Sequence, residues 1–418
     1  MNLYGSMIPI PSLRFNYSSN YAVSSSPRQG LKQFGPYDYD IFDKCEIRCG
    51  IIYPRCSENI KTAFVSELLN GSRYFGGFQK LFRIPLVLKE EQAITDESEK
   101  GIKMAINNLI NRDLDIFFII TSSSNTPIYR ICKAELLANG IPSQVVTEKK
   151  LQNSSQRQWI LENIALASYA KVGGTPWVVA NPIKKNQLVL GVSRVQDKSK
   201  RFFVGFVTLF TQDGDFILMH SKAPVIKWNE YIDGLEELIT EAINEYENKK
   251  GTPEEIIIHF HKRPGDKELE AIENALENEN REIPYALLHL NEYSNFRLFD
   301  SSDTTFVPES GWKVELSRHE SILLLDGRAG DRRRKMGVPK VLDIRIDKRS
   351  TLPIDSFPML IEQIYSFARV NWRGFNAAAI PITLNYSKLI ANMAVNVGMA
   401  NWNQIIASGK LRDKSWFL

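Results

Sequence analysis

A tyrosine and a lysine spaced four residues apart indicate a place where a phosphate group could bind. Tyr129 and Lys133 follow the apolar stretch 116–120, which reads as a buried strand, and Thr126-Pro127 is typical of a helix start. Both side chains then project from one face near the helix N-terminus. Unpaired N–H groups, the positive dipole end, an ammonium group and a phenol hydroxyl all suit a phosphate.

Two further polar residues are expected near this helix. Gln144 lies near the start of the next predicted strand, 141–147, and Lys171 ends the predicted helix 156–171. Each residue also has an ordinary structural explanation, since strand glutamines often lie at edges and a terminal lysine complements the helix dipole. Only the combination favours a binding pocket.

The elements that must position these residues alternate between strands and helices. In the first half we predict a strand at 45–53, helices at 58–69 and 100–112, the strand at 116–120, a helix from 126 to about 139, and the strand and helix that hold Gln144 and Lys171. This alternation predicts an α/β fold with a parallel, Rossmann-like sheet.

The second half begins with three successive strands instead. We predict strands at 188–194, 202–210 and 215–220, a helix at 231–248, a strand at 255–260, a helix at 267–277 and a strand at 285–290, followed by strands near Trp312 and Val341 and helices at 357–370 and 386–397. The order βββαβαβ is typical of a ribonuclease H-like fold.

The polar residues occur in an order that resembles the guide-binding pocket of Argonaute proteins. Tyr129-x-x-x-Lys133, Gln144 and Lys171 are followed at once by Val-Gly-Gly-Thr-Pro-Trp177. The resemblance extends to Asn125-Thr126-Pro127, Ile141-Pro142-Ser143-Gln144, Asn371-Trp372-Arg373-Gly374-Phe375 and Trp416-Phe417-Leu418. The chain is most similar in length to short prokaryotic Argonautes, which consist of MID and PIWI domains. This implies an N-terminal arm at 1–40 that packs on PIWI, a Rossmann-like MID domain at 41–172, and a ribonuclease H-like PIWI domain at 173–418.

The resemblance also implies a ligand set for the 5′ phosphate of a guide strand. Its members would be Tyr129, Lys133, Gln144, Lys171 and the C-terminal carboxylate of Leu418. A hard cation such as Mg²⁺ would join this carboxylate to the guide phosphates. Ala167 stands where relatives place a glutamine donor, which leaves the metal open. Trp416-Phe417 can also simply anchor the chain end in apolar packing.

The residues at the nuclease positions of the PIWI half argue against cleavage. Nucleases of this fold hold two metal ions with several carboxylates. Ser193, His261 and Lys388 stand at the expected positions, so we expect the carboxylate set to be lost and the protein not to be an enzyme. The alternative is a guide-directed nuclease with an atypical metal site around His259 and His261, with Asp213 or Asp215 as a further ligand.

Two cationic segments are candidate contacts for a nucleic-acid backbone. Arg373 follows Trp372, which we expect to offer an aromatic platform. A second segment carries Arg332, Arg333 and Arg334 beside Lys335. Such a run in a glycine-rich turn is most often only solvated.

Composition narrows the protein class without naming the ligand. The net charge of +4 is too small to identify a nucleic-acid binder. Four cysteines without paired spacing indicate reduced thiols rather than a zinc site or disulfides. No apolar run approaches the roughly 20 residues of a membrane span. We therefore expect a soluble, cytoplasmic protein without direct membrane insertion.

These features predict a guide-loaded recognition protein. The resemblance implies a short guide RNA or DNA with a 5′ phosphate, a complementary target that is invading DNA, and an APAZ-like partner protein. The partner would carry the effector, namely an NADase, a nuclease or a membrane protein, and act in prokaryotic immunity. A rival class is a mononucleotide or dinucleotide binder, which the absence of GxGxxG after the strand disfavours.

Overall fold

Two compact units make up the chain. The structure is a computed structural model that describes residues 4–73, 75–123, 126–153, 156–183, 185–196, 202–277, 282–326 and 337–418. The first unit contains residues 13–178, 372–375 and 392–418, and the second contains residues 1–12, 179–371 and 376–391.

A four-stranded parallel sheet forms the centre of the first unit. Its order is β5-β4-β6-β7, and the strands are β4 (Ile47–Pro54), β5 (Leu86–Ile94), β6 (Ile116–Thr121) and β7 (Ser143–Thr147). Every residue of β6 is buried, as expected for a strand covered on both faces. The predicted Rossmann-like alternation is confirmed. Strand β5 was missed because it is a half-exposed edge strand with Lys-Glu-Glu-Gln at its centre.

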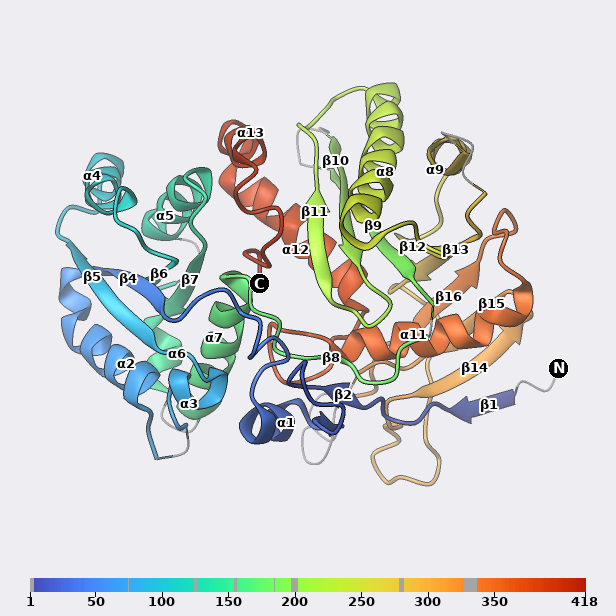
Figure 1. Ribbon diagram of the computed structural model, residues 1–418, viewed down its shortest axis with the longest axis horizontal. Coiled ribbons are helices and arrows are strands. Elements are labelled where there is room, and N and C mark those ends of the chain that lie inside the picture. The colour runs from blue at the N-terminus through green and yellow to red at the C-terminus, as the bar shows by residue number, and fades with distance from the viewer. Residues whose placement is uncertain are drawn as a thin grey trace. The chain divides into compact units, whose positions relative to one another are not determined.

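Helices cover this sheet and connect its strands (Figure 1). They are the 3-10 turn η1 (Arg55–Ser57) and the helices α2 (Glu58–Asn70), α3 (Phe78–Phe82), α4 (Glu99–Ile110), α5 (Pro127–Ala138), α6 (Glu148–Gln152) and α7 (Arg157–Lys171). Two further helices of this unit, α1 (Pro27–Phe34) and α13 (Met399–Ser408), contact α3 and α5 respectively. Helix α5 begins as its sequence predicts. The Thr126 side chain accepts a hydrogen bond from the N–H of Tyr129, and Pro127 occupies the first turn.

The second unit is built on a nine-stranded sheet of order β1-β14-β15-β16-β13-β12-β9-β10-β11. The strands are β1 (Tyr4–Met7), β9 (Gln187–Gln196), β10 (Phe202–Phe210), β11 (Phe216–His220), β12 (Glu255–His261), β13 (Tyr285–Asn291), β14 (Trp312–Ser317), β15 (Glu320–Leu323) and β16 (Leu342–Ile346). Strands β9, β10 and β11 form an antiparallel meander, and β12 pairs parallel with both β9 and β13. This order confirms the ribonuclease H-like fold.

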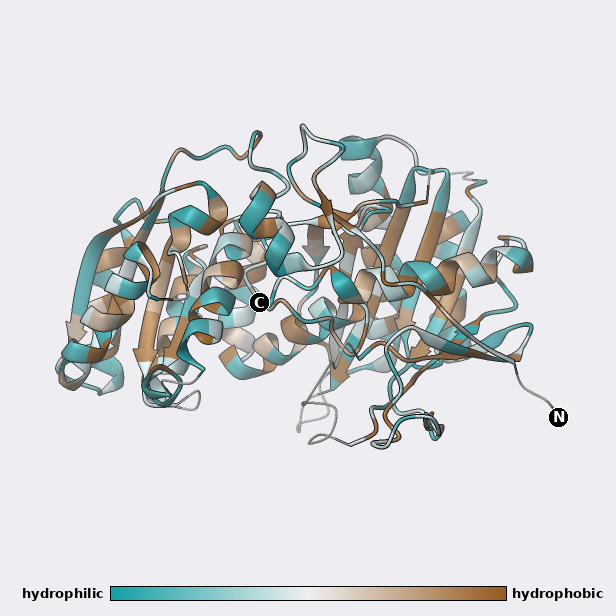
Figure 2. Ribbon diagram, turned by 90° about the horizontal axis from the view of Figure 1, so that it is seen from below, coloured by the Kyte–Doolittle hydropathy of each residue, from teal (hydrophilic) through white to brown (hydrophobic). Residues whose placement is uncertain are grey.

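Apolar side chains hold the second sheet to its helices. The helices are α8 (Trp228–Lys250), α9 (Asp266–Glu277), α11 (Phe357–Arg369) and α12 (Ile382–Val397). The 3-10 turn η3 (Ile354–Ser356) directly precedes α11. Leu235, Ile239 and Ile243 repeat along α8 at helical spacing and are fully buried in one cluster with β9 and β12. Figure 2 shows the strands of this sheet as largely hydrophobic and the helices as mixed.

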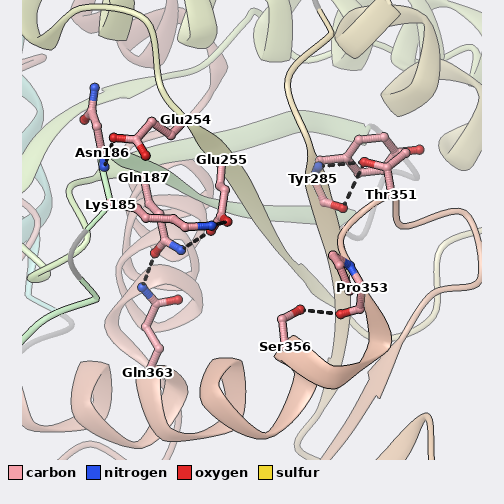
Figure 3. Close-up of polar contacts among 10 residues, drawn as sticks. All are labelled: Lys185, Asn186, Gln187, Glu254, Glu255, Tyr285, Thr351, Pro353, Ser356 and Gln363. Atoms are coloured by element: carbon pink, nitrogen blue, oxygen red, sulfur yellow. Dashed lines mark hydrogen bonds and ion pairs between the residues drawn. The ribbon is translucent and has the colours of Figure 1, made fainter.

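Polar residues at the amino ends of β9 and β12 satisfy one another (Figure 3). Gln187 donates to Glu255 at 2.6 Å and accepts from Gln363 of α11 at 2.9 Å. Lys185 forms an ion pair with the same Glu255 carboxylate. This network neutralises a buried carboxylate, so it is structural.

The compact units divide the chain differently from the expected domain limits. The arm expected at 1–40 is split. Residues 4–7 pair with β14 of the second unit, whereas α1 joins the first unit, where Arg28 binds Glu162 of α7 at 2.6 Å. Residues 372–375 and 392–418 also belong to the first unit instead of following the second half of the chain. Contacts between residues far apart in sequence decide these memberships, and local patterns do not reveal them.

A third sheet consists of three short strands. The strands β2 (Leu13–Arg14), β3 (Val23–Ser24) and β8 (Val178–Val179) form it in the order β3-β2-β8. Across the described ranges, no helix combines the length and apolar character needed to cross a membrane.

Candidate phosphate-binding site

Three of the predicted pocket residues meet at the first residues of β7. The ammonium group of Lys133, on α5, donates to the carbonyl oxygen of Ser143 at 2.6 Å. Lys171, the last residue of α7, donates to the same oxygen at 2.9 Å and to Oε1 of Gln144 at 2.8 Å. The strand and the two helices that flank it therefore bring two cations and an amide together, as predicted.

Burial makes this cluster unusual. The Lys133 and Lys171 residues are only 3% and 1% exposed. Desolvation lowers the pKa of Lys133 to about 8. It lowers the pKa of Lys171 well below 10.5, and the charges of Lys133 and Arg373 lower it further. Within the described ranges neither ammonium group forms an ion pair with a carboxylate. The cluster therefore favours an anion.

Tyr129 lies one helical turn before Lys133 and is half-buried. Burial raises the pKa of its phenol, while the charge of Arg373 acts in the opposite direction. The hydroxyl group consequently remains protonated at neutral pH and can donate to an anion. The charge of Arg373 lowers the pKa of both Tyr129 and Lys171, so this guanidinium lies close enough to contribute positive charge to the pocket. The sequence had suggested a backbone contact for Arg373 without connecting it to these residues.

Trp372 does not form the expected aromatic platform. It is 2% exposed, and its indole N–H donates to the carbonyl oxygen of Trp177 at 3.0 Å. Trp177 in turn packs against Phe375, with ring centroids 5.8 Å apart. The prediction was wrong because a Trp-Arg pair after a helix looks the same whether the indole is outside or in the core.

The C-terminal segment belongs to the same unit and is anchored by aromatic packing. Trp416 and Phe417 are buried, and Trp416 packs on Trp402 at 6.2 Å between ring centroids. The Leu418 N–H donates to the Ser415 carbonyl at 3.2 Å. Among the described residues, no hydrogen bond or ion pair connects Leu418 to the lysines. The apolar packing of the tail is thus confirmed, whereas the role of its carboxylate stays a prediction.

The oxygen atoms of the pocket do not make a good Mg²⁺ site by themselves. The Ser143 carbonyl and Gln144 Oε1 already accept hydrogen bonds from ammonium groups. Ala167 offers no side-chain oxygen. Asn163, one turn earlier on α7, has a buried Oδ1 without a partner in the described part of the chain, but one amide oxygen is too few for a hard cation. The lysines supply the positive charge here.

The predicted nuclease positions come together in the second unit. The last register pair of β9 and β12 is Val192 with Phe260, so Ser193, within β9, and His261, the last residue of β12, each directly follow that pair. Lys388 of α12 forms an ion pair with Glu292. His261, Glu292 and Lys388 line one cavity of about 50 Å³. Burial, followed by the charges of Lys262, Lys388 and Arg194, lowers the pKa of His261 to about 4.

The residues of the alternative metal site are engaged elsewhere. His259 is buried, its Nδ1 lies 2.9 Å from Thr383 Oγ1, and desolvation lowers its pKa to about 3. Asp213 accepts a hydrogen bond from Thr211 in the turn between β10 and β11, where Asp215 also lies. In the described ranges, no three His, Cys, Asp or Glu residues are grouped so that they could hold a metal ion.

One predicted group cannot be placed. Arg332, Arg333 and Arg334 lie outside the described residues.

Comparisons with known proteins agree with this architecture. A Piwi domain model matches residues 115–327, just over half of the chain. A Piwi protein of Archaeoglobus fulgidus is 26% identical over 411 residues, which cover 93% of each chain. An argonaute of Cereibacter sphaeroides is 24% identical over 93% of this chain, but the match spans only 56% of that longer protein.

A solved structure shares the fold. It is Clostridium butyricum Argonaute bound to a guide DNA and a 19-mer target DNA, with a TM-score of 0.77 and 17% sequence identity. The match covers 100% of this chain and 55% of that one. Because the family model covers just over half of the chain, the chain belongs to the Argonaute proteins that carry a Piwi domain.

Proposed function

We propose that this protein binds a guide strand by its 5′ phosphate and recognises nucleic acid complementary to that guide. The observation that carries the proposal is the convergence of two buried ammonium groups, Lys133 and Lys171, on the Ser143 carbonyl. A phosphate would supply the negative charge that this cluster needs, and the Tyr129 hydroxyl and Gln144 amide could donate to its oxygens. The family resemblance adds Leu418 and a bridging Mg²⁺ to this ligand set.

Recognition is proposed to occur without cleavage. Metal-dependent cleavage requires carboxylates that hold two cations beside the scissile phosphate. Ser193 of β9 and His261 of β12 directly follow the last paired residues of these adjacent strands, and the Lys388 ammonium neutralises Glu292. A lysine at this place would repel the divalent cation that the reaction needs.

The output of recognition is proposed to come from a partner. The resemblance to short prokaryotic Argonautes supports a guide RNA, an invading DNA target, and an APAZ-like protein that carries an NADase, a nuclease or a membrane protein as effector. Copurification from the native host, followed by sequencing of the bound strands, tests the partner and the guide type together.

The central experiment compares strands that differ only at the 5′ end. Purified protein is titrated with labelled strands that carry a 5′ phosphate or a 5′ hydroxyl, and each complex is then mixed with a complementary labelled DNA and Mg²⁺ or Mn²⁺. The proposal expects a clear preference for the phosphate and an intact target. Equal binding of the two strands would contradict the role of the pocket in binding the 5′ phosphate. Guide-directed cleavage of the target would favour the alternative, a nuclease with an atypical metal site.

A further inference from the structure

The first unit contains a second cationic cleft, formed between α1 and the connection from α2 to β5. Its volume is about 400 Å³, and it is lined by Lys32, Ser72, Arg73, Phe75, Gly76, Gly77, Lys80, Leu81 and Arg83. Four of these residues are basic. None of the described residues lining the cleft is acidic.

Backbone contacts hold Arg83 without neutralising its charge. Its guanidinium donates to the carbonyl oxygens of Lys80 and Lys32, each at 3.1 Å. The stem of Arg83 lies against Gly35, where an added Cβ would be 3.1 Å from Cγ. Because carbonyl groups rather than carboxylates fix this side chain, its full charge remains available in a set direction.

Lys80 is positioned by a glycine. A Cβ on Gly76 would lie 2.6 Å from Cδ of Lys80, so the lysine stem occupies the space that a side chain would fill. The Lys80 ammonium forms no ion pair with a described carboxylate. Lys32 does have one, with Glu162 at 3.1 Å, but this carboxylate is shared with Arg28. Lys80 and Arg83 therefore carry positive charges that no described carboxylate neutralises.

Backbone contacts hold the described residues of the segment that forms the cleft floor. Gly71 and Gly77 both have φ of 89°, and a Cβ on either would come within 2.6 Å of a backbone oxygen. The Ser72 N–H donates to the Phe75 carbonyl at 2.6 Å, and Phe75 is buried. This close approach of backbone segments requires glycine. Lys80 and Arg83 follow this closely packed backbone in the chain.

The cleft is separate from the pocket at Ser143 but lies at the same edge of the sheet. Residues 72–83 precede the amino end of β5, and Ser143 begins β7. Parallel strands place their amino ends along one edge of the sheet, and β5 and β7 are the outer strands of the order β5-β4-β6-β7. The cleft lining and the pocket at Ser143 share no residue.

We propose that this cleft is a second phosphate-binding site, which takes either backbone phosphates of a nucleic-acid strand or a free nucleoside phosphate. Lys80 and Arg83 would make the direct contacts. The strand source rests on the proposed function, whereas the nucleotide source does not.

Lys80→Glu is the informative variant because Lys80 is exposed and its side chain forms no hydrogen bond or ion pair with a described residue. Lys80→Arg tests whether charge is sufficient, and Lys100→Glu is the matched control at an exposed position of α4 in the same unit. Two probes are used. A labelled 5′-hydroxyl single strand reports strand phosphates, and ATP added to protein already loaded with a 5′-phosphorylated strand reports a free nucleotide outside the first pocket.

For Lys80→Glu we expect binding of at least one probe to weaken by roughly tenfold or more. Lys80→Arg and Lys100→Glu should bind like the wild type. If the strand is the ligand, the slope of log affinity against log salt concentration should also become shallower by about 0.7 for each phosphate that Lys80 neutralises in the wild type. Affinities within a factor of about two for both probes would overturn the proposal.

The outcomes separate this site from the proposed function. If the pocket at Ser143 does not bind a 5′ phosphate, the wild type shows no preference for 5′-phosphorylated strands. ATP binding is then measured with protein that carries no strand. If the cleft does not bind phosphate, that preference is present but Lys80→Glu alters the binding of neither the labelled strand nor ATP. Retention of the preference in Lys80→Glu also shows that the variant is folded.

Discussion

Lys133 and Lys171, from two different helices, share one acceptor, the carbonyl oxygen of Ser143. Two ammonium groups this close and this buried repel each other and lose hydration, so each is more easily deprotonated than a lysine in water. The arrangement costs stability in the empty protein, and an anion would reverse that cost. Several consequences can be measured.

The preference for a 5′ phosphate should decrease as the pH rises above about 8. In the empty protein the pKa of Lys133 is about 8 and that of Lys171 is well below 10.5. A bound phosphate raises both pKa values, so binding takes up protons. The affinity for the phosphate is greatest at a pH below the lysine pKa values of the free protein. It decreases as the pH rises through the higher lysine pKa values of the complex. Titrations of phosphate-ended and hydroxyl-ended strands from pH 7 to about 9.5 at constant ionic strength check this, and a constant ratio would contradict it.

Lys171→Met should separate ligand binding from stability. Removing a charge-assisted hydrogen bond should weaken binding of a 5′-phosphorylated strand by about 1.5 to 3 kcal/mol, whereas a hydroxyl-ended strand should change little. The free energy of unfolding of the empty protein should fall by less than about 1 kcal/mol or even rise, since methionine fills the space without a buried charge. Calorimetry and urea unfolding measure the two quantities, with Lys100→Met as the control. A large loss of stability would show that Lys171 is mainly structural.

Tyr129→Ala combined with Lys133→Ala should weaken binding of phosphorylated strands far more than of hydroxyl-ended strands. Both side chains lie on one face of α5, where they can reach the same phosphate. Removing two hydrogen-bond donors to the phosphate predicts a combined effect on the order of 3 kcal/mol. Filter binding with both strands measures it. Equal reductions in affinity for the two strands would show that Tyr129 and Lys133 do not bind the 5′ phosphate.

Introducing carboxylates at Ser193 and His261 on adjacent strands of the second unit should create a divalent-cation site. In Ser193→Asp/His261→Asp/Lys388→Ala, two neighbouring carboxylates join Glu292, which loses its lysine partner. Oxygen ligands of this kind suit Mn²⁺. We expect Mn²⁺ to raise the melting temperature of this variant but not of the wild type, because ligands that bind only the folded state stabilise it. The double variant that retains Lys388 should respond less, and an unchanged melting temperature in the triple variant would contradict the geometry.

Asp38 provides a test of stability outside the ligand site. It is buried, accepts hydrogen bonds from the Tyr169 hydroxyl at 2.6 Å and the Thr175 N–H at 2.8 Å, and has a pKa raised by desolvation to about 6. Because the raised pKa favours the protonated form, its contribution to stability is complete below pH 4 and decreases as the pH rises to 6, by up to about 3 kcal/mol. Asp38→Asn should lack this pH dependence. Urea unfolding of both proteins at pH 4.5 and about 7 measures the difference, and parallel curves would argue against it.

Local sequence patterns determined the elements and much of the pocket. The apolar run of β6, the Thr126-Pro127 start of α5 and the end of α7 at Lys171 depend on interactions within a few residues, so their types and spacing could be read directly. Once the parallel sheet was inferred, the meeting of Lys133, Gln144 and Lys171 followed. The edge strand β5 was not evident, because exposure of one side removes the apolar pattern.

Only the tertiary structure decided what each side chain faces. Trp372 is in the core although its neighbour Arg373 is exposed, and the chain segments 372–375 and 392–418 join a unit formed mostly by residues before 179. The second cationic cleft arises because Lys32 of α1 meets Lys80 and Arg83 from beyond α2. Burial and long-range packing set these relationships, since they depend on residues that are distant in sequence and brought together only when the sheets and helices assemble.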